Sequence, residues 1–428
     1  MRFIKPKLIY LDHASATPID QSVHKTISKL EKELFANPNG IHATSVKVRN
    51  EIDIARANIA RAINAHPDEI IFTGSGTESD ALAILGLVNE YSKDGVQNLP
   101  HIVTTNIEHS AVIENCKMLE GKGLAEVTYV QVEANGIVDP KKIEEALKEN
   151  TILVSVMYAN NEIGTIQPIQ EIAKVLRRFR KNKQDTQNLS RVGAPGERVK
   201  REEFAYLAGV PFLHTDACQA MNYLFTENIE KLGVDMMSFN GSKIYGPKGV
   251  GVLYKKRNVN LAPIYRGGGQ EGSLRSGTED VASIVGVSKA LEITNKLKES
   301  EVKRLEELRD YFFSQIPNLE KSTGYEIHIN GDKVNRLPNN INISIRNISS
   351  ELVVIELSAL GIAVSSKSAC KSTEEESSHV IHALRIAGDE FDSEESLRIT
   401  LGRHTRIQDM KKLLKVLESI LLKYAKWN

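Results

Sequence analysis

The sequence predicts an α/β protein with a mostly parallel central sheet and a second, smaller α+β domain. Three observations lead to this prediction. Short apolar runs rich in β-branched residues alternate with amphipathic helical stretches over most of the 428 residues. The runs are almost continuously apolar, as in strands that are buried on both faces of a parallel sheet. From about residue 279 onward, a long helical period followed by mixed short segments replaces this alternation.

The larger domain is expected to contain seven strands. In chain order they are Ile70–Thr73, His101–Thr105, Val127–Val132, Thr151–Met157, Val210–Thr215, Val234–Phe239 and Val250–Tyr254. Helices are expected to begin near Thr77 and to span Pro168–Arg178. Ligands of such sheets bind beyond the carboxyl ends of the strands, so we expect the chemistry at that edge.

The smaller domain follows from the pattern after Glu279. Helical periodicity runs from there to about Ile316. The later elements are expected to be the strands Tyr325–Ile329 and Asn340–Ile345 and the helices Leu352–Leu360 and Ile407–Tyr424. We expect a large domain over 20–295, and a small domain that 1–19 forms together with 296–428.

Composition excludes several classes of protein. Lys and Arg number 55, and Asp and Glu also number 55, so a global attraction to nucleic acid or to an anionic membrane is not expected. No apolar run approaches the roughly 18 residues of a membrane helix, and the N-terminus has no long apolar core of a secretion signal. The cysteines, Cys116, Cys218 and Cys370, form no disulfide framework, which favours a reducing, cytoplasmic location. His379 and His382 alone are too few ligands for structural zinc, so no metal is expected.

One segment departs from the alternation. Residues 177–201 carry nine basic and two acidic side chains, and the middle of the segment is polar with Gly and Pro. A solvated, flexible loop explains this composition, and so does a docking site for an acidic protein or RNA.

Two glycine-rich motifs are candidate phosphate sites. Thr73–Ser79 (TGSGTES) follows an expected strand and opens a helix, so free amide groups and the Thr77 and Ser79 hydroxyls form a potential phosphate cradle. A helix N-cap followed by Glu78 explains the same residues. The G-x-G-x-x-G match at Gly267–Gly272 neither follows a strand of the right type nor opens a helix, so it is weak evidence for a dinucleotide site.

Lys243 and Asp216 follow or end two expected strands. A lysine desolvated at a strand end can form a Schiff base with a carbonyl, although an exposed loop lysine is the commoner case, with Lys248 as the comparison. Asp216 either holds a protonated pyridine nitrogen or caps the next helix. A lysine, an acidic partner and a phosphate cradle together indicate a pyridoxal phosphate site.

Cys370 lies in a small, polar segment, Ser365–Ser378. Lys367 and Lys371 favour its thiolate, so the sequence indicates a reactive, accessible cysteine, with an inert surface thiol as the alternative. Cys116 and Cys218 stand in helix-like contexts that are typical of packing residues.

An ordered set of motifs over nearly the whole chain resembles the cysteine desulfurases, which are pyridoxal phosphate enzymes of fold type I. The motifs are YLDHASATP (10–18), NPNGIH (37–42), IIFTGSGTESDAL (70–82), EHSAV (108–112), NNEIGTIQP (160–168), HTDACQA (214–220), KIYGPKGVGVLY (243–254), GGGQEGSLRSGTED (267–280), SSKSAC (365–370) and LRITLGR (397–403). The resemblance implies a large domain with a mostly parallel, seven-stranded type of sheet between helices.

The resemblance also implies roles for single residues. Lys243 would form the Schiff base with pyridoxal 5'-phosphate, and Asp216 would bind its ring nitrogen. His109 would stack on the ring and take part in proton transfers. Asn161 and Gln219 would bond to the phenolic oxygen of the cofactor. Gly76 and Thr77 would bind its phosphate, which Thr278 would also reach from a second subunit. Arg398 would bind the substrate carboxylate, and Cys370 would be the nucleophile.

The implied reaction converts L-cysteine to alanine and leaves a persulfide on Cys370, which passes sulfur to an acceptor protein. The long polar stretch after Cys370 is similar to the branch of the family that serves iron–sulfur assembly and tRNA thiolation. A homodimer is implied by the same analogy. The alternatives are a selenocysteine lyase or another lyase with the same cofactor, and a non-catalytic sulfur-relay or RNA-binding scaffold.

The sequence departs from the family in several positions. Ser242 precedes the lysine where a histidine is usual, and Asn240 stands where a phosphate-binding serine is common, so Ser242 is expected to supply that hydroxyl. Lys367 replaces a glycine before the nucleophile, and His13 stands where Asn or Tyr is frequent. The basic insertion at about 180–203 is absent from typical members, and we expect it to dock the sulfur acceptor.

Overall fold

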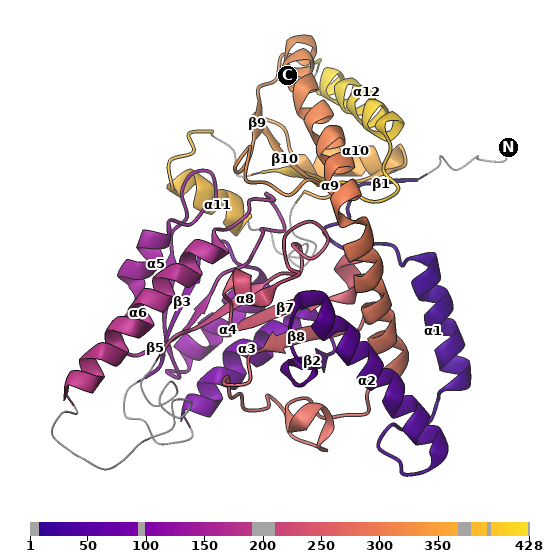
Figure 1. The fold of residues 1–428 in the computed structure, drawn as a ribbon. Helices are drawn as coiled ribbons and strands as arrows, with labels where there is room; N and C mark the ends of the chain where they lie inside the picture. The colour runs from indigo at the N-terminus through magenta and orange to yellow at the C-terminus, as the bar shows by residue number, and fades with distance from the viewer. Residues whose placement is uncertain (1–7, 93–98, 191–209, 367–377, 392–394, 427–428) are drawn as a thin grey trace.

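A seven-stranded sheet forms the centre of the larger part of the molecule (Figure 1). The structure is a computed structural model that describes residues 8–92, 99–190, 210–366, 378–391 and 395–426. In chain order the strands are β2 (Ile70–Thr73), β3 (His101–Thr105), β4 (Glu126–Val130), β5 (Thr151–Ser155), β6 (Phe212–Asp216), β7 (Met236–Asn240) and β8 (Gly251–Lys255). Their spatial order is β2-β8-β7-β6-β5-β3-β4, with β8 antiparallel to both neighbours and the other pairs parallel.

The predicted larger sheet is confirmed, strand by strand. Each of the seven apolar runs forms a strand, and no strand end differs from its predicted position by more than two residues. The mostly parallel arrangement is also confirmed, because only a buried parallel sheet favours runs that are apolar on both faces.

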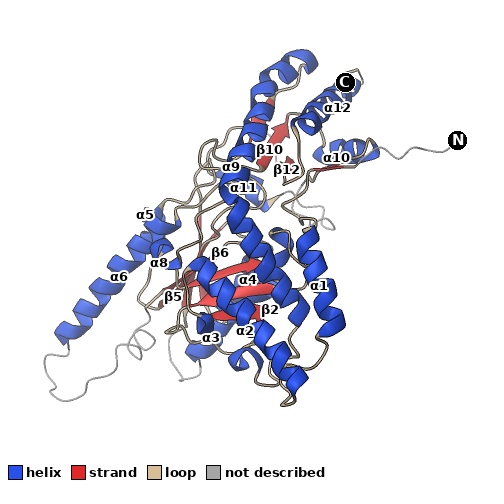
Figure 2. Cartoon of the chain, turned by 45° about the vertical axis from the view of Figure 1, so that its right-hand side comes forward, coloured by secondary structure: helices blue, strands red, loops and turns tan. Residues whose placement is uncertain are grey.

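Helices cover both faces of this sheet (Figure 2). Side chains alternate between the faces of a strand. Ile70 and Phe72 therefore pack into a core shared with α2 (Ala43–Ile63) and α9 (Val281–Thr323). Ile71, which lies between them, packs into a second core, beneath α3 and α4. The helices of the larger part are, besides α2 and α9, α1 (Gln21–Glu33), α3 (Gly76–Tyr91), α4 (Ser110–Gly121), α5 (Pro140–Ala146), α6 (Ile169–Ser190) and α8 (Ile229–Leu232).

A separate hydrophobic core holds the smaller part together. Its antiparallel sheet has the order β12-β10-β9, and the N-terminal strand β1 pairs in parallel with β11. The elements of this part are β1 (Ile9–Tyr10), β9 (Ile327–Ile329), β10 (Asn340–Ile345), α10 (Ser350–Ala359), β11 (Ile362–Ala363), β12 (Leu397–Thr400) and α12 (Ile407–Tyr424). Helix α11 (His379–Ile386) lies between β11 and β12 in the sequence, but its buried side chains pack into the core of the larger part. Strand β1 thus packs with elements from the last third of the chain.

Helix α9 joins the two parts. At a rise of 1.5 Å per residue, its 43 residues extend over about 65 Å. Its N-terminal residues, such as Val287, pack in the core beneath the large sheet, and its C-terminal residues, such as Phe312, pack in the small core. It ends at Gly324, whose φ of 78° favours glycine. The domain boundary that we predict after residue 295 falls inside this helix, and the division stays a prediction.

The basic segment begins as helix and not as loop. We expected the loop from about residue 180, but α6 continues to Ser190, because nothing between Pro168 and Gly193 breaks a helix. Several of its basic side chains already have partners; for example, Arg180 pairs with Asp235, and Lys183 donates to the carbonyl of Glu149. The remainder of the predicted loop, 191–203, lies outside the described residues.

Two features are not found in the described part of the chain. None of its helices is both long and apolar enough to cross a membrane. It also contains no group of three or more His, Cys, Asp or Glu side chains that could hold a metal ion.

A buried carboxylate connects four elements at the edge of the sheet where the parallel strands begin. Asp235, just before β7, is 2% exposed. It accepts hydrogen bonds from the amide of Leu213 on β6, from Arg180 on α6, and from Lys256 after β8. Burial alone would raise the pKa of Asp235, but the charges of Arg180 and Lys256 hold that pKa below its ordinary value.

We predict that Asp235→Asn lowers the free energy of unfolding by about 1.5–3 kcal/mol at pH 7, because it removes the counter-charge of two partly buried cations and charged hydrogen bonds with it. Because the folded-state pKa of Asp235 is lowered, its contribution to the free energy of unfolding is present above the unfolded-state pKa of about 3.9. That contribution is lost as the pH falls through the folded-state pKa. Urea unfolding of wild type and variant at pH 7 and at several pH values down to about 2 measures both effects.

Asp68→Asn is the matched control. Asp68 also pairs with an arginine, Arg257, but its side chain is 58% exposed. We expect it to change the free energy of unfolding by less than about 1 kcal/mol. Equal effects of the two substitutions would contradict the structural role of Asp235.

Candidate active site

The carboxyl ends of five parallel strands meet at one edge of the large sheet, and polar side chains follow each of them. Ser75 follows β2, His109 follows β3, Asn161 follows β5, Asp216 ends β6, and Lys243 follows β7. A parallel sheet places such ends side by side and leaves a crevice beyond them. The predicted position of the chemistry therefore corresponds to one place in the fold.

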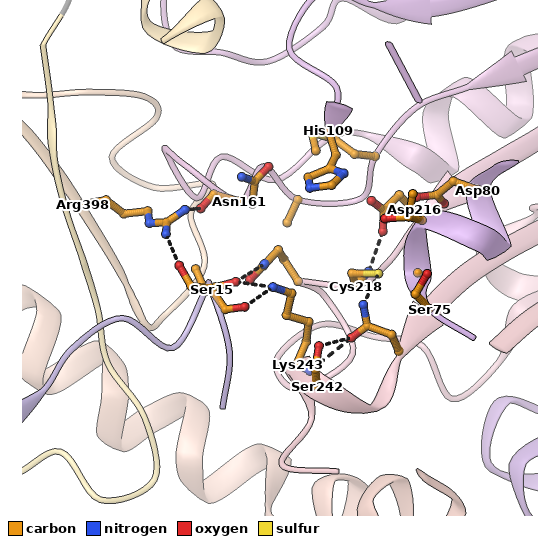
Figure 3. A pocket seen from close by; sticks show the side chains of 17 residues that line it. Ser15, Ser75, Asp80, His109, Asn161, Asp216, Cys218, Ser242, Lys243 and Arg398 are labelled. Carbon is orange, nitrogen blue, oxygen red and sulfur yellow. Dashed lines mark hydrogen bonds between the residues drawn. The ribbon is translucent and has the colours of Figure 1, made fainter. Parts of the chain in front are cut away.

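A single cavity of about 250 Å³ lies at this edge (Figure 3). Ten of the twelve predicted site residues line it. They are Gly76, Thr77, His109, Asn161, Asp216, Gln219, Asn240, Ser242, Lys243 and Arg398. The other lining residues, which the sequence did not single out as site residues, are Ala14, Ser15, Ser75, Asp80, Met157, Ala159 and Cys218.

Lys243 is a half-buried residue of the cavity wall and not an exposed loop lysine. It ends the 3-10 turn η3 (Gly241–Lys243), which directly follows β7. Its Nζ donates to the carbonyl oxygens of Ala14, at 2.7 Å, and Ser15, at 2.5 Å. Lys248, the comparison residue, is exposed and does not line this cavity. The fold therefore directs only the first of these two lysines towards the polar strand ends.

Asp216 combines the two roles between which the sequence left a choice. Its Oδ1 accepts the amide of Cys218 at 2.8 Å, as a capping residue does. Its side chain is nevertheless part of the cavity wall, at the opposite end from Arg398 (Figure 3). The turn after β6 thus fixes a carboxylate that faces the cavity.

The start of α3 contributes backbone amide groups to the cavity. Ser75 caps the helix by accepting the amide of Glu78, so the predicted N-cap is present alongside the predicted cradle. Gly76 is required by close packing, because a Cβ there would lie 2.7 Å from Asn240 Nδ2 and 2.8 Å from Cys218 Sγ. The expectation for Ser79 is wrong, since its hydroxyl bonds to Thr73 and to the Ser75 carbonyl inside the protein.

Asn240 and Ser242 shape the wall next to Lys243. Asn240 caps the 3-10 turn by accepting the amide of Lys243 at 3.2 Å, and its Nδ2 donates to Cys218 Sγ at 3.5 Å. The hydroxyl of Ser242 donates to Asn240 Oδ1 at 3.1 Å. Both departures from the family pattern therefore place a polar group on the wall while keeping the lysine turn intact.

His109 has a defined tautomer when neutral. Its Nδ1 accepts the amide of Ala111 at 3.1 Å where it caps α4, so its proton is on Nε2. Figure 3 shows the ring projecting into the cavity between Asn161 and Asp216. Gln219 also lines the cavity and donates to the carbonyl of Ala14 at 3.0 Å.

Arg398 comes from the smaller part of the molecule, on β12, and is 2% exposed. Its Nη2 donates to Asp12 Oδ1 at 3.0 Å and to Ser15 Oγ at 2.7 Å, and its Nη1 donates to the carbonyl of Asn161 at 3.1 Å. Its Nε has no hydrogen-bond partner among the described residues. A buried guanidinium with one unused donor, at the rim of a cavity, is suited to bind a carboxylate.

Two predicted site residues are not among the described residues that line this cavity. Thr278 is exposed and does not line it. Cys370 and its neighbour Lys367 lie outside the described residues. Of the two other cysteines, Cys116 is fully buried in α4, whereas Cys218 lies in the turn after β6 and not in a helix.

Comparisons with known proteins agree with this geometry. Residues 9–182 and 207–413 match the family described as Aminotransferase class-V, with a gap where the basic insertion lies. A protein named "Cysteine desulfurase IscS" from Dictyoglomus turgidum is 40% identical over 415 residues, which cover 97% of this chain and 95% of that protein. "Cysteine desulfurase IscS 1" from Archaeoglobus fulgidus is 37% identical over 412 residues, or 96% of each chain.

Solved structures show the same likeness. One titled "NifS-like protein" superposes with a TM-score of 0.82 at 31% identity and covers 97% of this chain and 99% of its own. Another, titled "SspA in complex with cysteine", has a TM-score of 0.70 at 30% identity and covers 92% and 98%.

Fold and cavity together define an α/β enzyme of the class-V aminotransferase type, with its site at the strand ends of a mostly parallel sheet. Within that class, the chain belongs to the cysteine desulfurase family. The resemblance on which the sequence analysis rested is confirmed.

We predict that neither described cysteine reacts readily in the folded protein. Burial raises the pKa of the Cys116 thiol to about 12 and raises the pKa of the Cys218 thiol well above its ordinary value. Reagents attack the thiolate, so both thiols should be inert near neutral pH. In a Cys370→Ser protein, a chromogenic disulfide reagent should detect almost no thiol before urea is added and two thiols afterwards. Rapid labelling of either cysteine in the folded variant would refute this.

Proposed function

We propose that the protein converts L-cysteine to L-alanine with pyridoxal 5'-phosphate as cofactor and transfers the sulfur to Cys370. One observation carries the proposal. A single cavity unites a strand-end lysine, an aspartate, a histidine and a buried arginine, which come from elements far apart in the sequence. The named relatives and the neighbour solved in complex with cysteine support the choice of substrate.

The cavity residues fit the cofactor. Lys243 would hold it covalently through Nζ, and Asp216 would face its ring nitrogen. The free amide groups at the start of α3, beside Gly76 and Thr77, would bind its phosphate. Gly76 keeps this helix end free of a side chain, because a Cβ there would clash with Asn240 and Cys218. When bound, the cofactor supplies an electron sink for the charge that develops at the substrate α-carbon.

Proton transfers fall to the chain's own side chains. Lys243 Nζ is positioned by two carbonyl oxygens, so it is a compact donor at a fixed point of the wall. His109 directs Nε2, which carries the proton of its neutral form, into the same space. Asn161 and Gln219 line the wall near these groups and are proposed to orient the cofactor.

Arg398 is proposed to bind the substrate carboxylate. Its guanidinium is already oriented by Asp12, Ser15 and the Asn161 carbonyl, and Nε is unused among the described residues. It lies at the opposite end of the cavity from Asp216, so a substrate held there spans the space above Lys243 (Figure 3).

The described residues on either side of the Cys370 segment bond to Arg398 and to Glu162, the residue after Asn161. Ser365 pairs through both backbone groups with Arg398. On the other side, Ser378 donates to Glu162 at 2.6 Å. Cys370 lies outside the described residues, but it follows Ser366 by four positions in the sequence, which supports the proposal that its thiol reaches the substrate site. The Cys370 thiolate would take the substrate sulfur, the carbon–sulfur bond would break, and a proton at carbon would complete alanine.

The persulfide sulfur is proposed to pass to an acceptor protein of iron–sulfur assembly or tRNA thiolation, in the cytoplasm. The reduced, buried Cys116 and Cys218 are consistent with a reducing compartment. We also propose a homodimer, because Thr278 is exposed outside its own cavity and is available to a second copy. The docking role of the basic insertion stays a prediction.

We predict that Cys370→Ser reduces sulfide and alanine formation from L-cysteine to background, because the sulfur then has no nucleophile to accept it. The visible absorption of the bound cofactor should remain, since the substitution leaves Lys243 untouched. Cys116→Ala is the matched control and should keep its turnover. A Cys370→Ser protein with wild-type turnover would contradict the proposed mechanism.

We predict that Arg398→Lys lowers kcat/KM for L-cysteine by about 10–100-fold, mainly through KM. A lysine cannot reproduce the planar fork that contacts Asp12, Ser15 and Asn161, and loss of a charged hydrogen bond costs about 1.5–3 kcal/mol. Arg406→Lys, at an exposed position on the same part of the molecule, should leave both constants unchanged. An unaltered KM in Arg398→Lys would exclude the assigned role.

A further inference from the structure

Asp80 is a second carboxyl group in the cavity wall that the proposed reaction does not use. It lies on α3, one helical turn after Gly76, and is 1% exposed. Its Oδ1 is buried and has no hydrogen-bond partner within the described ranges. Figure 3 shows the Asp80 and Asp216 side chains next to one another at the same end of the cavity. An unpaired buried carboxyl oxygen is costly, so it needs an explanation.

The groups around Asp80 provide no positive charge. His214 Nε2 lies 3.6 Å from Asp80 Oδ1, but burial lowers the pKa of His214 to about 4, so this ring is neutral at neutral pH. Both ring nitrogens are already engaged, with the hydroxyls of Ser155 and Ser238. The other neighbours are acidic or neutral, namely Asp216, Glu108, whose pKa burial raises to about 8, and the thiol of Cys218.

Of the two adjacent aspartates, Asp216 is the one equipped to hold the charge. It accepts a backbone amide at 2.8 Å. Asp80 lines the same cavity, but no backbone amide of the described residues bonds to it, and the side-chain hydrogen bond with Ser238 lowers its pKa by less than burial raises it. Burial, and the repulsion from Asp216, raise the pKa of Asp80 well above its ordinary value. Two like charges at one buried site are unfavourable, so the proton belongs on Asp80.

We propose that Asp80 is a positioning residue, held as a neutral carboxylic acid, that donates a hydrogen bond towards Asp216 once the cofactor fills the cavity. A carboxylate that accepts a hydrogen bond is favoured in its charged form. Asp216 would then remain ionised opposite the ring nitrogen, and the proton would stay on that nitrogen. The positioning role of Asp80 rests on the proposed function, whereas the neutral state of Asp80 does not depend on that function.

The first test measures that neutral state in the full chain. Because the folded-state pKa of Asp80 is raised, wild-type stability is fully present below the unfolded-state pKa of about 3.9 and falls as the pH rises towards the folded-state value. Asn cannot titrate. We therefore expect Asp80→Asn to gain, relative to wild type, up to about tenfold in the folding equilibrium constant per pH unit between pH 5 and pH 7.

Asp68→Asn is the control for this test. The exposed carboxyl group of Asp68 has a lowered pKa and is ionised throughout this range, so the ratio of the folding equilibrium constants of Asp68→Asn and wild type should not change with pH. Urea unfolding at each pH provides the constants. A flat ratio for Asp80→Asn would show an ionised Asp80 and overturn the proposal.

The second test follows the visible absorption of protein loaded with pyridoxal 5'-phosphate as a function of pH. Asp80→Asn keeps a hydrogen-bond donor and should titrate as wild type, whereas Asp80→Leu lacks one and should shift the midpoint by a pH unit or more. An Asp80→Leu titration identical to wild type would overturn the positioning role. If wild type itself takes up no cofactor, the proposed function fails, while the unfolding test still decides the state of Asp80.

Discussion

The direction of the strands is the constraint on which the rest of this structure depends. Because the strands β2, β3, β5, β6 and β7 run parallel, their carboxyl ends open into the same crevice. Each end then needs only one or two polar residues to contribute to a common site. The antiparallel strand β8 separates β2 from β7 and still leaves both ends at this edge. The parallel direction of these strands thus brings residues that are distant in the sequence to one site.

The second requirement is to hold charges in a largely buried space. Asp216 is stabilised by a backbone amide, and Lys243 by two carbonyl oxygens. Arg398 is delivered from the smaller part, and its bonds to Asp12 and Ser15 join the N-terminal segment to β12. The small core therefore serves the site directly, because it carries the guanidinium that closes one end of the cavity. Removing the proton from Asp80 would add a charge that no neighbour offsets.

Strong local patterns made most of the fold predictable. The seven buried runs read directly as strands, and α12 has the bounds that its periodicity predicts. The pairing of Ile9 with Ile362 was not predictable, because a two-residue strand carries no periodicity and depends on contacts distant in sequence. At the site, glycine-rich and strand-end motifs pointed to Gly76, Thr77, Asp216 and Lys243, and the family resemblance supplied the other six predicted lining residues, but neither pointed to Asp80. Its importance comes from burial beside Asp216, although its position four residues after Gly76 places both on one helix face.

The central claim is that this cavity holds pyridoxal phosphate on Lys243. Borohydride reduction of the purified, cofactor-loaded protein, followed by proteolysis and mass spectrometry, tests it most directly, because reduction fixes the cofactor to the amine that carries it. The account predicts one phosphopyridoxyl adduct, on the peptide that contains Lys243. An adduct on Lys248 or elsewhere, or none after loading, would contradict the account.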